Sequence, residues 1–271
     1  MSIYKRSISG MKNSGAYQNR AFDPFVDSIT MLGNRLEKSS PLTDSDYPFR
    51  RLFDIIAASL ALIILSPVIL FAALLIKLES KGPVFYKQER IGLNRRNGDR
   101  RNRSDIDGGD TLRDRRSGRD RRQNSEAGKP FVMFKLRTMK TDAEKHGPVL
   151  ASANDSRITR VGRILRKTRV DELPQFINVI KGDMTLIGPR PERSFYIKAL
   201  SRDVPEFPLR LKTKPGITGL AQVESGYADT IEAMKTKLMY DLNYIMTKSF
   251  LQDIAIVLKT FYVVVSGRGA Q

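Results

Sequence analysis

The sequence contains no cysteine, no tryptophan and a single histidine among its 271 residues. The absence of cysteine excludes a disulfide scaffold, an iron–sulfur cluster, a thiolate zinc site and catalysis by a cysteine nucleophile. One histidine excludes metal sites built from several histidines and argues against a histidine-centred catalytic triad. A chain of this length is still long enough to bury the core of one domain or of two small domains.

Acidic residues are also scarce relative to basic ones. The chain has 47 Lys and Arg residues against 29 Asp and Glu residues, which gives a net charge of +18. Such an excess indicates an anionic partner, which is nucleic acid, an anionic membrane surface or a phosphorylated substrate. Composition does not choose among these three classes, so the choice depends on where along the chain the charges and apolar residues lie.

The first part of the chain offers little to build a core. Residues 1–46 are rich in Ser, Asn, Lys and Arg and show no sustained hydrophobic periodicity. Such a segment buries too little apolar surface to offset the entropy of ordering it, so we expect a disordered polar tail. It also lacks an apolar stretch next to a small-residue cleavage site, which excludes a secretory signal.

One long apolar run follows. Residues 53–76 read FDIIAASLALIILSPVILFAALLI, and Asp54 is the only charge in these 24 residues. A run of this length indicates a membrane helix. Ser66-Pro67 lies near its middle, where proline removes a backbone hydrogen bond and predicts a kink.

Basic residues flank both ends of the run. Arg50 and Arg51 precede it, and Lys77 and Lys81 follow it. Because positive charge favours the cytoplasmic side, both ends are predicted to lie there, as in a kinked helix that enters and leaves by one face. A span with an ordinary proline kink is the alternative on these residues alone. Either arrangement predicts that the basic globular part after the run is cytoplasmic.

Residues 94–122 form a low-complexity block with eleven Arg, six Asp and no aromatic residue. Such a block cannot make a core and is expected to be a solvated loop. The alternative is a patch that binds nucleic acid or anionic lipid. Against it, no aromatic residue is interleaved for base stacking, and the Asp residues reduce the net charge of the block to +5 (11 − 6).

The rest of the chain alternates short elements. Residues 130–138 indicate a strand or extended segment, and Arg residues every third position over 157–166 predict one basic helix face. Residues 173–180 predict a helix, with proline in its first turn and glycine after its end. Residues 250–265 are apolar but carry two charges, which predicts a core helix or a helix in the membrane interface.

Two adjacent acids carry the chemistry. Asp171 and Glu172 come just before the helix that begins near Pro174, and the plain interpretation is an N-cap and a first-turn acid. Arg166 and Arg169 lie just upstream, however, and nearby cations keep a carboxylate ionised and attract phosphate. An ionised Asp beside a phosphate site suits an aspartyl-phosphate mechanism, and the second carboxylate is suited to hold Mg²⁺.

Six motifs occur in order between about residues 48 and 265. They are Arg-x-Phe-Asp (51–54), the apolar run with Ser66-Pro67, Phe-Lys-Leu-Arg-Thr-Met (134–139), Asp-Glu-Leu-Pro-Gln (171–175), Lys-Gly-Asp-Met-x-x-x-Gly-Pro-Arg-Pro (181–191) and Lys-Pro-Gly-Ile-Thr-Gly-x-x-Gln-Val (214–223). Together they resemble the bacterial sugar transferase family, whose members are monotopic polyprenyl-phosphate phosphoglycosyl transferases.

The resemblance implies an activity and roles for individual residues. It implies Mg²⁺-dependent transfer of a sugar 1-phosphate from a UDP-sugar to undecaprenyl phosphate, with release of UMP, as the first membrane step of exopolysaccharide assembly. Asp171 matches the nucleophile, which would form a covalent phosphosugar intermediate, and Glu172 matches the Mg²⁺ ligand. It also implies a re-entrant helix–break–helix anchor with its break at Ser66-Pro67. The cations expected to bind the substrate phosphates are Lys135, Arg137, Arg166 and Arg190.

The sequence departs from the family pattern in two places. The Arg-rich segment over 94–128 lies where the family runs directly from Gln-x-Arg-x-Gly (88–92) into the motif at 134–139, so we interpret it as a disordered insertion without an inherited role. The multi-span N-terminal region of longer members does not occur, which resembles the short, core-only form. Asp241 fits a further family motif, and we expect a structural polar contact for it.

These observations predict an α/β, mostly α, membrane-associated enzyme of the bacterial inner membrane. Its expected parts are the disordered tail 1–46, a re-entrant anchor over 48–80 and a small cytoplasmic catalytic domain over 81–265 with amphipathic interfacial helices. The expected partners are a UDP-sugar, undecaprenyl phosphate and membrane lipids, with homo-oligomerisation left open and no specific nucleic acid. The sequence does not name the sugar.

A function from another class competes with this one. A non-enzymatic basic protein that tethers nucleic acid or another polyanion to the membrane would explain the net charge and the Arg-rich block. It would not explain the adjacent acids Asp171 and Glu172 or the order of the motifs.

Overall fold

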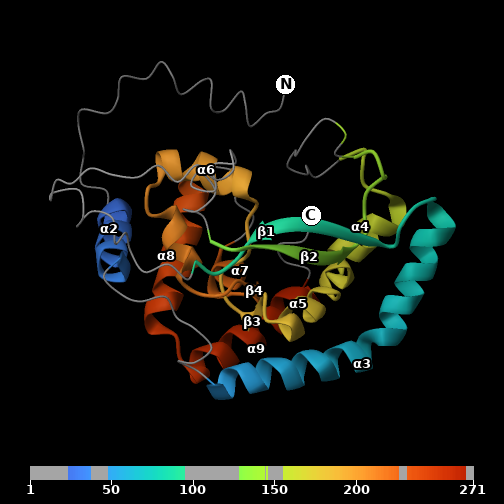
Figure 1. The fold of residues 1–271 in the computed structure, drawn as a ribbon, viewed down its shortest axis with the longest axis horizontal. Coiled ribbons are helices and arrows are strands. Elements are labelled where there is room, and N and C mark those ends of the chain that lie inside the picture. Colours follow the sequence, from blue (N-terminus) through green and yellow to red (C-terminus); the bar gives the residue numbers. More distant parts are fainter. Residues whose placement is uncertain are drawn as a thin grey trace, which may run out of the picture.

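The computed structural model describes residues 24–37, 48–94, 128–143, 145, 155–225 and 231–266. These parts of the chain are mostly helical and include two small sheets of two strands each. Figure 1 shows the longest helix, α3, running along one side of the globular part and then turning along an adjacent side. The expected insertion over 94–128 lies outside the described residues except at its two ends.

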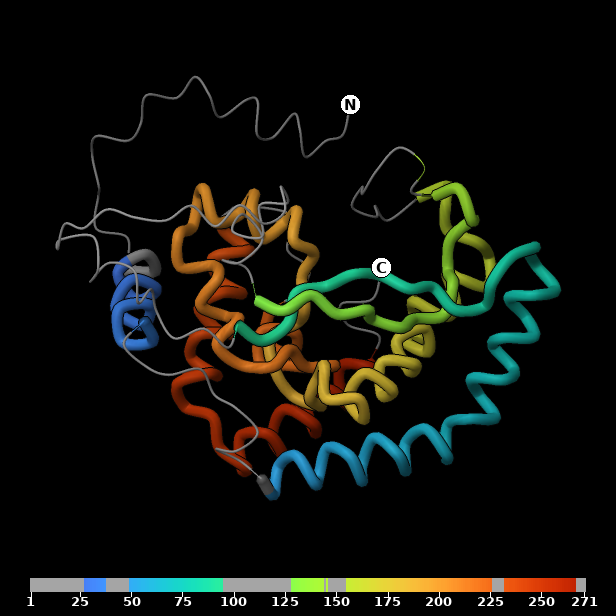
Figure 2. Tube along the Cα trace, viewed as in Figure 1, coloured from blue at the N-terminus to red at the C-terminus, as the bar shows by residue number. Residues whose placement is uncertain are grey.

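Helix α3 (Pro48–Glu79) contains the apolar run as one continuous helix of 32 residues, with Pro67 inside it. The prediction that the helix is interrupted at Ser66-Pro67 is therefore wrong. The helix continues through Pro67 and bends instead (Figures 1 and 2). Pro67 has no N–H to donate to the carbonyl of Ile63, four residues earlier. The hydroxyl of Ser66 donates to that carbonyl at 2.8 Å, which satisfies the freed acceptor without interrupting the helix.

Only one face of α3 packs against the rest of the protein. Asp54 and Ala58 are buried before the bend, and Ala72 and Ile76 are buried after it. The spacing of four residues within each pair places its members on one helix face. The large apolar side chains point outward instead, so only 11% of the most apolar stretch is buried. Among the described residues, this is the helix long and apolar enough to cross a membrane.

A β-hairpin follows α3. Strand β1 (Phe85–Ile91) pairs antiparallel with β2 (Pro130–Leu136), and Tyr86 lies opposite Lys135. The strand expected over 130–138 is confirmed up to Leu136. The pairing continues past the strands, because the N–H of Gly92 donates to the carbonyl of Lys129 at 2.9 Å. The two chain segments that lead into and out of the Arg-rich block are therefore hydrogen-bonded to each other.

A second group of elements carries the acid pair. Helix α4 (Arg160–Lys167) leads into the short 3-10 helix η4 (Val170–Glu172) and then into α5 (Gln175–Lys181). The helix expected over 173–180 is confirmed with a small shift, and it ends at Gly182, whose φ of 86° favours glycine. Strand β3 (Thr185–Ile187) then pairs in parallel with β4 (Gly216–Thr218).

The four-arginine face expected over 157–166 is not formed. The side chain of Thr159 caps the start of α4 by accepting the N–H of Gly162, so Arg157 lies before the helix. Arg157 pairs with Asp155 at 2.6 Å. The helix itself therefore carries only the last three of these arginines.

The remaining helices build the main core. They are α6 (Ser194–Asp203), the 3-10 helix η5 (Phe207–Lys212), α7 (Leu220–Glu224), α8 (Ile231–Thr247) and α9 (Phe250–Ser266). Leu238, Leu242 and Tyr244 of α8 lie at the centre of this core. Helix α9 buries Asp253 and Ile256 and leaves a broad apolar face exposed.

The expectation of a disordered tail over 1–46 is wrong for Pro24–Glu37, which forms helix α2. Ile29 and Leu36 are buried in the main core, and Lys212 donates to the carbonyl oxygens of Leu36 and Glu37 at the end of the helix. The two buried side chains are seven positions apart, so they share one helix face. This short face becomes stable only against α8 and η5, which a local reading of the sequence cannot detect. The other residues of the tail lie outside the described ranges.

Candidate active site

Asp171 and Glu172 lie in η4, between α4 and α5. Arg169 turns the chain between α4 and η4 with a φ of 60°, in the left-handed region. Helix α5 has Pro174 as its N-cap, with no side-chain cap hydrogen bond. The plain interpretation of the acids as a cap is therefore wrong, and both carboxylates are largely buried, with Asp171 only 7% exposed.

Two cations from separate parts of the chain converge on Glu172. Lys135 of β2 places its Nζ 3.0 Å from Glu172 Oε1. Arg190, in the loop after β3, places Nη2 2.6 Å from the same oxygen and Nη1 3.4 Å from Oε2. The structure thus brings together three of the residues that the sequence selected, over separations of 37 and 18 positions.

The two acids have opposite electrostatic surroundings. Burial, together with the negative charge of Glu172, raises the pKa of Asp171 to about 6. Burial alone would also raise the pKa of Glu172, but the charges of Arg190 and Lys135 outweigh it and hold that pKa well below its ordinary value. Neighbouring carboxyl groups with separated pKa values are suited to different roles. Asp171 is the more basic of the two and is still mostly ionised at pH 7.

Arg166 and Arg137 lie at the edge of this arrangement. The Nε of Arg166 donates to Thr138 Oγ1 at 2.9 Å, and the Arg166 charge lowers the pKa of Asp171, so this residue acts on the site. Arg137 is buried and donates to the carbonyl oxygens of Ser80 and Lys81, both at 2.9 Å. The structure does not bring Arg137 to the acids. Strand β2 ends at Leu136, so the side-chain alternation that would align Arg137 with Lys135 does not continue.

Asn178, which is fully buried in α5, was not among the residues predicted from the sequence. Its Oδ1 accepts the N–H of Phe134 at 3.0 Å, and its Nδ2 donates to the carbonyl of Val132 at 2.6 Å. The amide therefore pairs with β2 as a neighbouring strand would, and it fixes the strand that carries Lys135. A single polar residue within the otherwise apolar stretch Phe-Ile-Asn-Val-Ile was the available signal.

The sequence matches the model of the bacterial sugar transferase family over residues 45–99 and 112–267. The chain belongs to the bacterial sugar transferase family. The matched residues include α3, the hairpin and every residue of the site, whereas α2 precedes them. The gap in the match at 100–111 falls inside the Arg-rich block.

Individual members of the bacterial sugar transferase family are also similar to this chain. A UDP-N-acetylgalactosamine-undecaprenyl-phosphate N-acetylgalactosaminephosphotransferase from Aeromonas hydrophila is 38% identical over 222 residues, which cover 82% of this chain and 45% of the relative. A UDP-glucose:undecaprenyl-phosphate glucose-1-phosphate transferase from Caulobacter vibrioides is 39% identical over 215 residues, 78% of this chain and 67% of the relative. An exopolysaccharide production protein from Rhizobium leguminosarum bv. phaseoli is 35% identical over 222 residues, 79% of this chain and 94% of the relative.

The chain spans about half the length of several of these curated relatives, including the Aeromonas protein and a glucose-1-phosphate transferase from Klebsiella pneumoniae. The relatives named above also differ in the sugar that their names specify. Membership of the bacterial sugar transferase family therefore leaves the donor sugar of this chain undetermined.

The donor atoms at the site fit a magnesium ion that shares its ligands with a substrate. The described residues contain no cluster of three or more acidic or histidine side chains, which excludes an all-protein cage within them. Mg²⁺ commonly takes one or two carboxylates and completes its shell with phosphate oxygens and water. The carboxylate of Glu172, which the sequence resemblance assigns to the ion, offers one such ligand.

Proposed function

We propose that this protein transfers a sugar 1-phosphate from a UDP-sugar to undecaprenyl phosphate, as the first membrane step of polysaccharide or exopolysaccharide assembly. The observation that carries the proposal is the buried pair Asp171 and Glu172, with Lys135 and Arg190 on Glu172. Relatives named for this transfer support the reaction type. The sugar remains one of the hexoses or N-acetylated amino sugars carried by UDP.

The proposed reaction has two displacements at one phosphorus atom. A carboxylate oxygen of Asp171 attacks the sugar-bearing phosphorus, and the bond from that phosphorus to the bridging oxygen breaks, so UMP leaves with the electron pair. A phosphate oxygen of undecaprenyl phosphate then attacks the same phosphorus. The bond to Asp171 breaks, which frees the carboxylate and gives the undecaprenyl diphosphate sugar. A pKa of about 6 leaves Asp171 ionised at pH 7, so the first step needs no separate base.

The surrounding charges have separate tasks in this proposal. Arg190 and Lys135 offset the negative charge of the diphosphate, and positive groups preset around such a charge often make the largest contribution to the rate. Glu172 would hold Mg²⁺ together with the donor, and the ion when bound neutralises phosphate charge. Because Glu172 also pairs with both cations, it keeps their charges close to Asp171, which makes the attack.

The contacts of α3 support a re-entrant anchor. At its start, Arg50 pairs with Asp253 of α9 at 2.6 Å. At its end, Glu79 accepts the N–H groups of Arg160 and Val161 at 2.6 and 3.0 Å. Both ends of the helix are thus held by the same globular body, whereas a straight span of this length would separate them by about 30 Å or more across the bilayer.

The apolar faces of α3 and α9 define the proposed membrane side. The start of α3 lies beside the start of α9 (Figure 2), and Phe53 packs edge-to-face on Phe250 with ring centroids 6.3 Å apart. Both helices expose large apolar side chains there. We infer that α9 lies in the interface and that the basic globular part faces the cytoplasm of the bacterial inner membrane.

A donor panel tests the proposed function. The full chain in lipid nanodiscs is incubated with Mg²⁺, undecaprenyl phosphate and one of UDP-glucose, UDP-galactose, UDP-N-acetylglucosamine or UDP-N-acetylgalactosamine, and UMP is measured. We expect one or more donors to release UMP, with a strongly reduced but measurable rate in Arg190→Gln and an unchanged rate in the control Lys198→Gln, which changes an exposed residue of α6. No UMP from any donor, together with steeply salt-dependent DNA binding, would favour the competing polyanion tether.

A further inference from the structure

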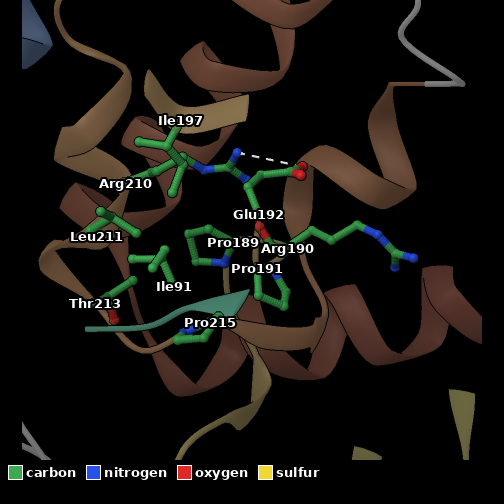
Figure 3. Close-up of a pocket in the computed structure, with 10 residues that line it drawn as sticks. All are labelled: Ile91, Pro189, Arg190, Pro191, Glu192, Ile197, Arg210, Leu211, Thr213 and Pro215. Atoms are coloured by element: carbon green, nitrogen blue, oxygen red, sulfur yellow. Dashed lines mark hydrogen bonds and ion pairs between the residues drawn. The ribbon is translucent and has the colours of Figure 1, made fainter. Parts of the chain in front are cut away.

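The loop that presents Arg190 has an unusual backbone. It follows β3 and reads Gly-Pro-Arg-Pro-Glu over residues 188–192. Its two prolines have no N–H, so the loop cannot be held by a regular strand ladder on that side. Figure 3 shows the Arg190 side chain pointing away from the other residues that line a small cavity behind the loop. What fixes this backbone therefore also fixes the point from which Arg190 reaches Glu172.

All four carbonyl groups from Pro189 to Glu192 have a hydrogen-bond donor. The outer two accept backbone N–H groups, Gly216 to Pro189 at 3.0 Å and Ile91 to Glu192 at 3.0 Å. The inner two accept arginine side chains. Arg210 Nη2 donates to the carbonyl of Arg190 at 2.9 Å, and Arg90 Nη1 donates to the carbonyl of Pro191 at 3.0 Å.

Arg210 is itself paired with a buried acid, through the same Nη2 atom that donates to the Arg190 carbonyl. Asp241 of α8 is 2% exposed, and its Oδ2 lies 2.7 Å from Arg210 Nη2. Glu192 is more distant from Arg210, at 3.9 Å, and lies closer to Arg90, at 3.4 Å. Asp241 is therefore the nearest acid that aims the Arg210 guanidinium at the loop.

These contacts form one continuous chain of polar interactions. It runs from Asp241 to Arg210, from Arg210 to the Arg190 carbonyl, and from the Arg190 side chain to Glu172. We propose that Asp241 and Arg210 are positioning residues for the transfer reaction, which they support by fixing the backbone of Arg190. This inference rests on the proposed function and assigns neither residue a contact with the substrate.

The chain of contacts predicts the effect of single substitutions. Asp241→Asn keeps the shape of the side chain but removes its charge, so Arg210 turns toward Glu192 and releases the Arg190 carbonyl. Displacing a catalytic cation by a fraction of an ångström to an ångström lowers kcat by about tenfold or more. The KM for the UDP-sugar changes less, since Lys135 and the rest of the site remain. Arg210→Lys has a similar effect, because the lysine side chain is shorter and its ammonium does not reach the position of Nη2, which contacts both Asp241 and the Arg190 carbonyl.

A double-mutant cycle tests the positioning role. We expect Asp241→Asn to lower kcat about tenfold in the wild-type background and to have little further effect in Arg190→Gln, because both changes remove the same contribution. Asp241→Glu, which keeps the charge, should recover part of kcat. The control Asp203→Asn changes an exposed acid of α6 and should alter neither background. Equal losses in the two backgrounds, or an unchanged kcat in Asp241→Asn, would overturn the proposal.

A second readout is independent of turnover. Phenylglyoxal modifies accessible arginines, and mass spectrometry locates the modified residue. We expect Arg190 to be modified faster in Asp241→Asn and in Arg210→Lys than in the wild type or Asp203→Asn, because its guanidinium leaves Glu172. Unchanged Arg190 modification in a folded Arg210→Lys variant refutes the positioning role, even if every donor is turned over. Faster modification in a protein that releases no UMP would instead refute the proposed function and leave the contact chain intact.

Discussion

Glu172 and Arg190 approach to 2.6 Å, although they lie 18 residues apart in separate elements. This ion pair links the short helix η4 to the loop after β3, and Lys135 joins it from the hairpin. The neighbouring Asp171 is buried beside the same cations and has a raised pKa. One acid of the pair thus organises positive charge, while the other is the more basic and is free for a different task.

Substitution of each acid should give distinct results. Asp171→Asn should prevent formation of the covalent phosphosugar adduct and should lower kcat by a factor on the order of 10³ or more, because an amide is a very poor nucleophile. Glu172→Gln should lower the rate and shift its dependence on Mg²⁺. Enzyme, labelled UDP-sugar and Mg²⁺ are incubated without acceptor, and mass spectrometry locates the label. If UMP release requires undecaprenyl phosphate and no adduct forms on Asp171, a single displacement replaces the two-step reaction.

The rate of adduct formation should depend on the ionisation of Asp171. Burial raises its pKa to about 6, and the ionised form reacts, so the rate should fall as pH drops through that region and level off above it. Arg166 lowers this pKa, so Arg166→Gln should move the acidic limb to higher pH. Both enzymes are compared at one Mg²⁺ concentration, because bound Mg²⁺ shifts the limb downward.

The exposed Arg163 of α4 provides the control for the pH profile. Arg163→Gln removes the same charge from the same helix but should leave the acidic limb in place. A limb that stays fixed in Arg166→Gln, or moves to lower pH, would show that Asp171 is not the group that titrates.

The re-entrant anchor predicts that both ends of α3 react from the same side. Since the chain has no cysteine, Pro48→Cys and Lys81→Cys introduce single labelling sites. Lys81 is preferred over Gly82, where φ is 126° and a Cβ would lie 2.7 Å from Thr141. An impermeant maleimide should label both sites only from the cytoplasmic side, as it should label the control Lys198→Cys.

Labelling of residue 48 from the periplasm, with residue 81 labelled from the cytoplasm, would show a span. Pro67→Ala restores an N–H donor opposite the Ile63 carbonyl and should straighten α3. We expect a larger spanning fraction in that variant, measured by the same labelling.

Asn178 should matter for stability through its contacts with β2. Asn178→Ala leaves the buried N–H of Phe134 and the carbonyl of Val132 without their partner, which should lower the free energy of unfolding by about 2–4 kcal/mol. Thermal unfolding in detergent measures the change. Asn243→Ala alters an exposed asparagine of α8 and should leave the melting temperature nearly unchanged. Equal melting temperatures for the two variants would contradict the role given to Asn178.

The Arg-rich block should be dispensable for turnover. Replacing residues 95–122 with a short Gly/Ser linker keeps the contacts at the base of the hairpin, where Gly92 bonds to Lys129 and Asn94 donates to the Leu211 carbonyl at 2.8 Å. We expect UMP release to stay within a few-fold of wild type. A loss of about tenfold, near 1.4 kcal/mol, in a folded and membrane-bound variant would show that the block contacts substrate or lipid.

Local patterns in the sequence determined the elements that carry the site. The apolar run of α3, the strand ending at Leu136 and the helix ending at Gly182 follow from periodicity, a proline and a glycine, which act over a few residues. The acid pair was recognisable for the same reason, since arginines precede it and a proline follows it within a few residues.

The tertiary structure alone decided which side chains meet. Lys135 and Arg137 are two positions apart and both basic, yet Lys135 pairs with Glu172 and Arg137 donates to the backbone just after α3. The formation of helix α2 likewise depends on elements distant in sequence, and so does the chain of contacts from Asp241 to Arg190. The physical reason is that burial, ion pairing and pKa shifts arise from what surrounds a group in space, whereas backbone conformation is set largely by its neighbours along the chain.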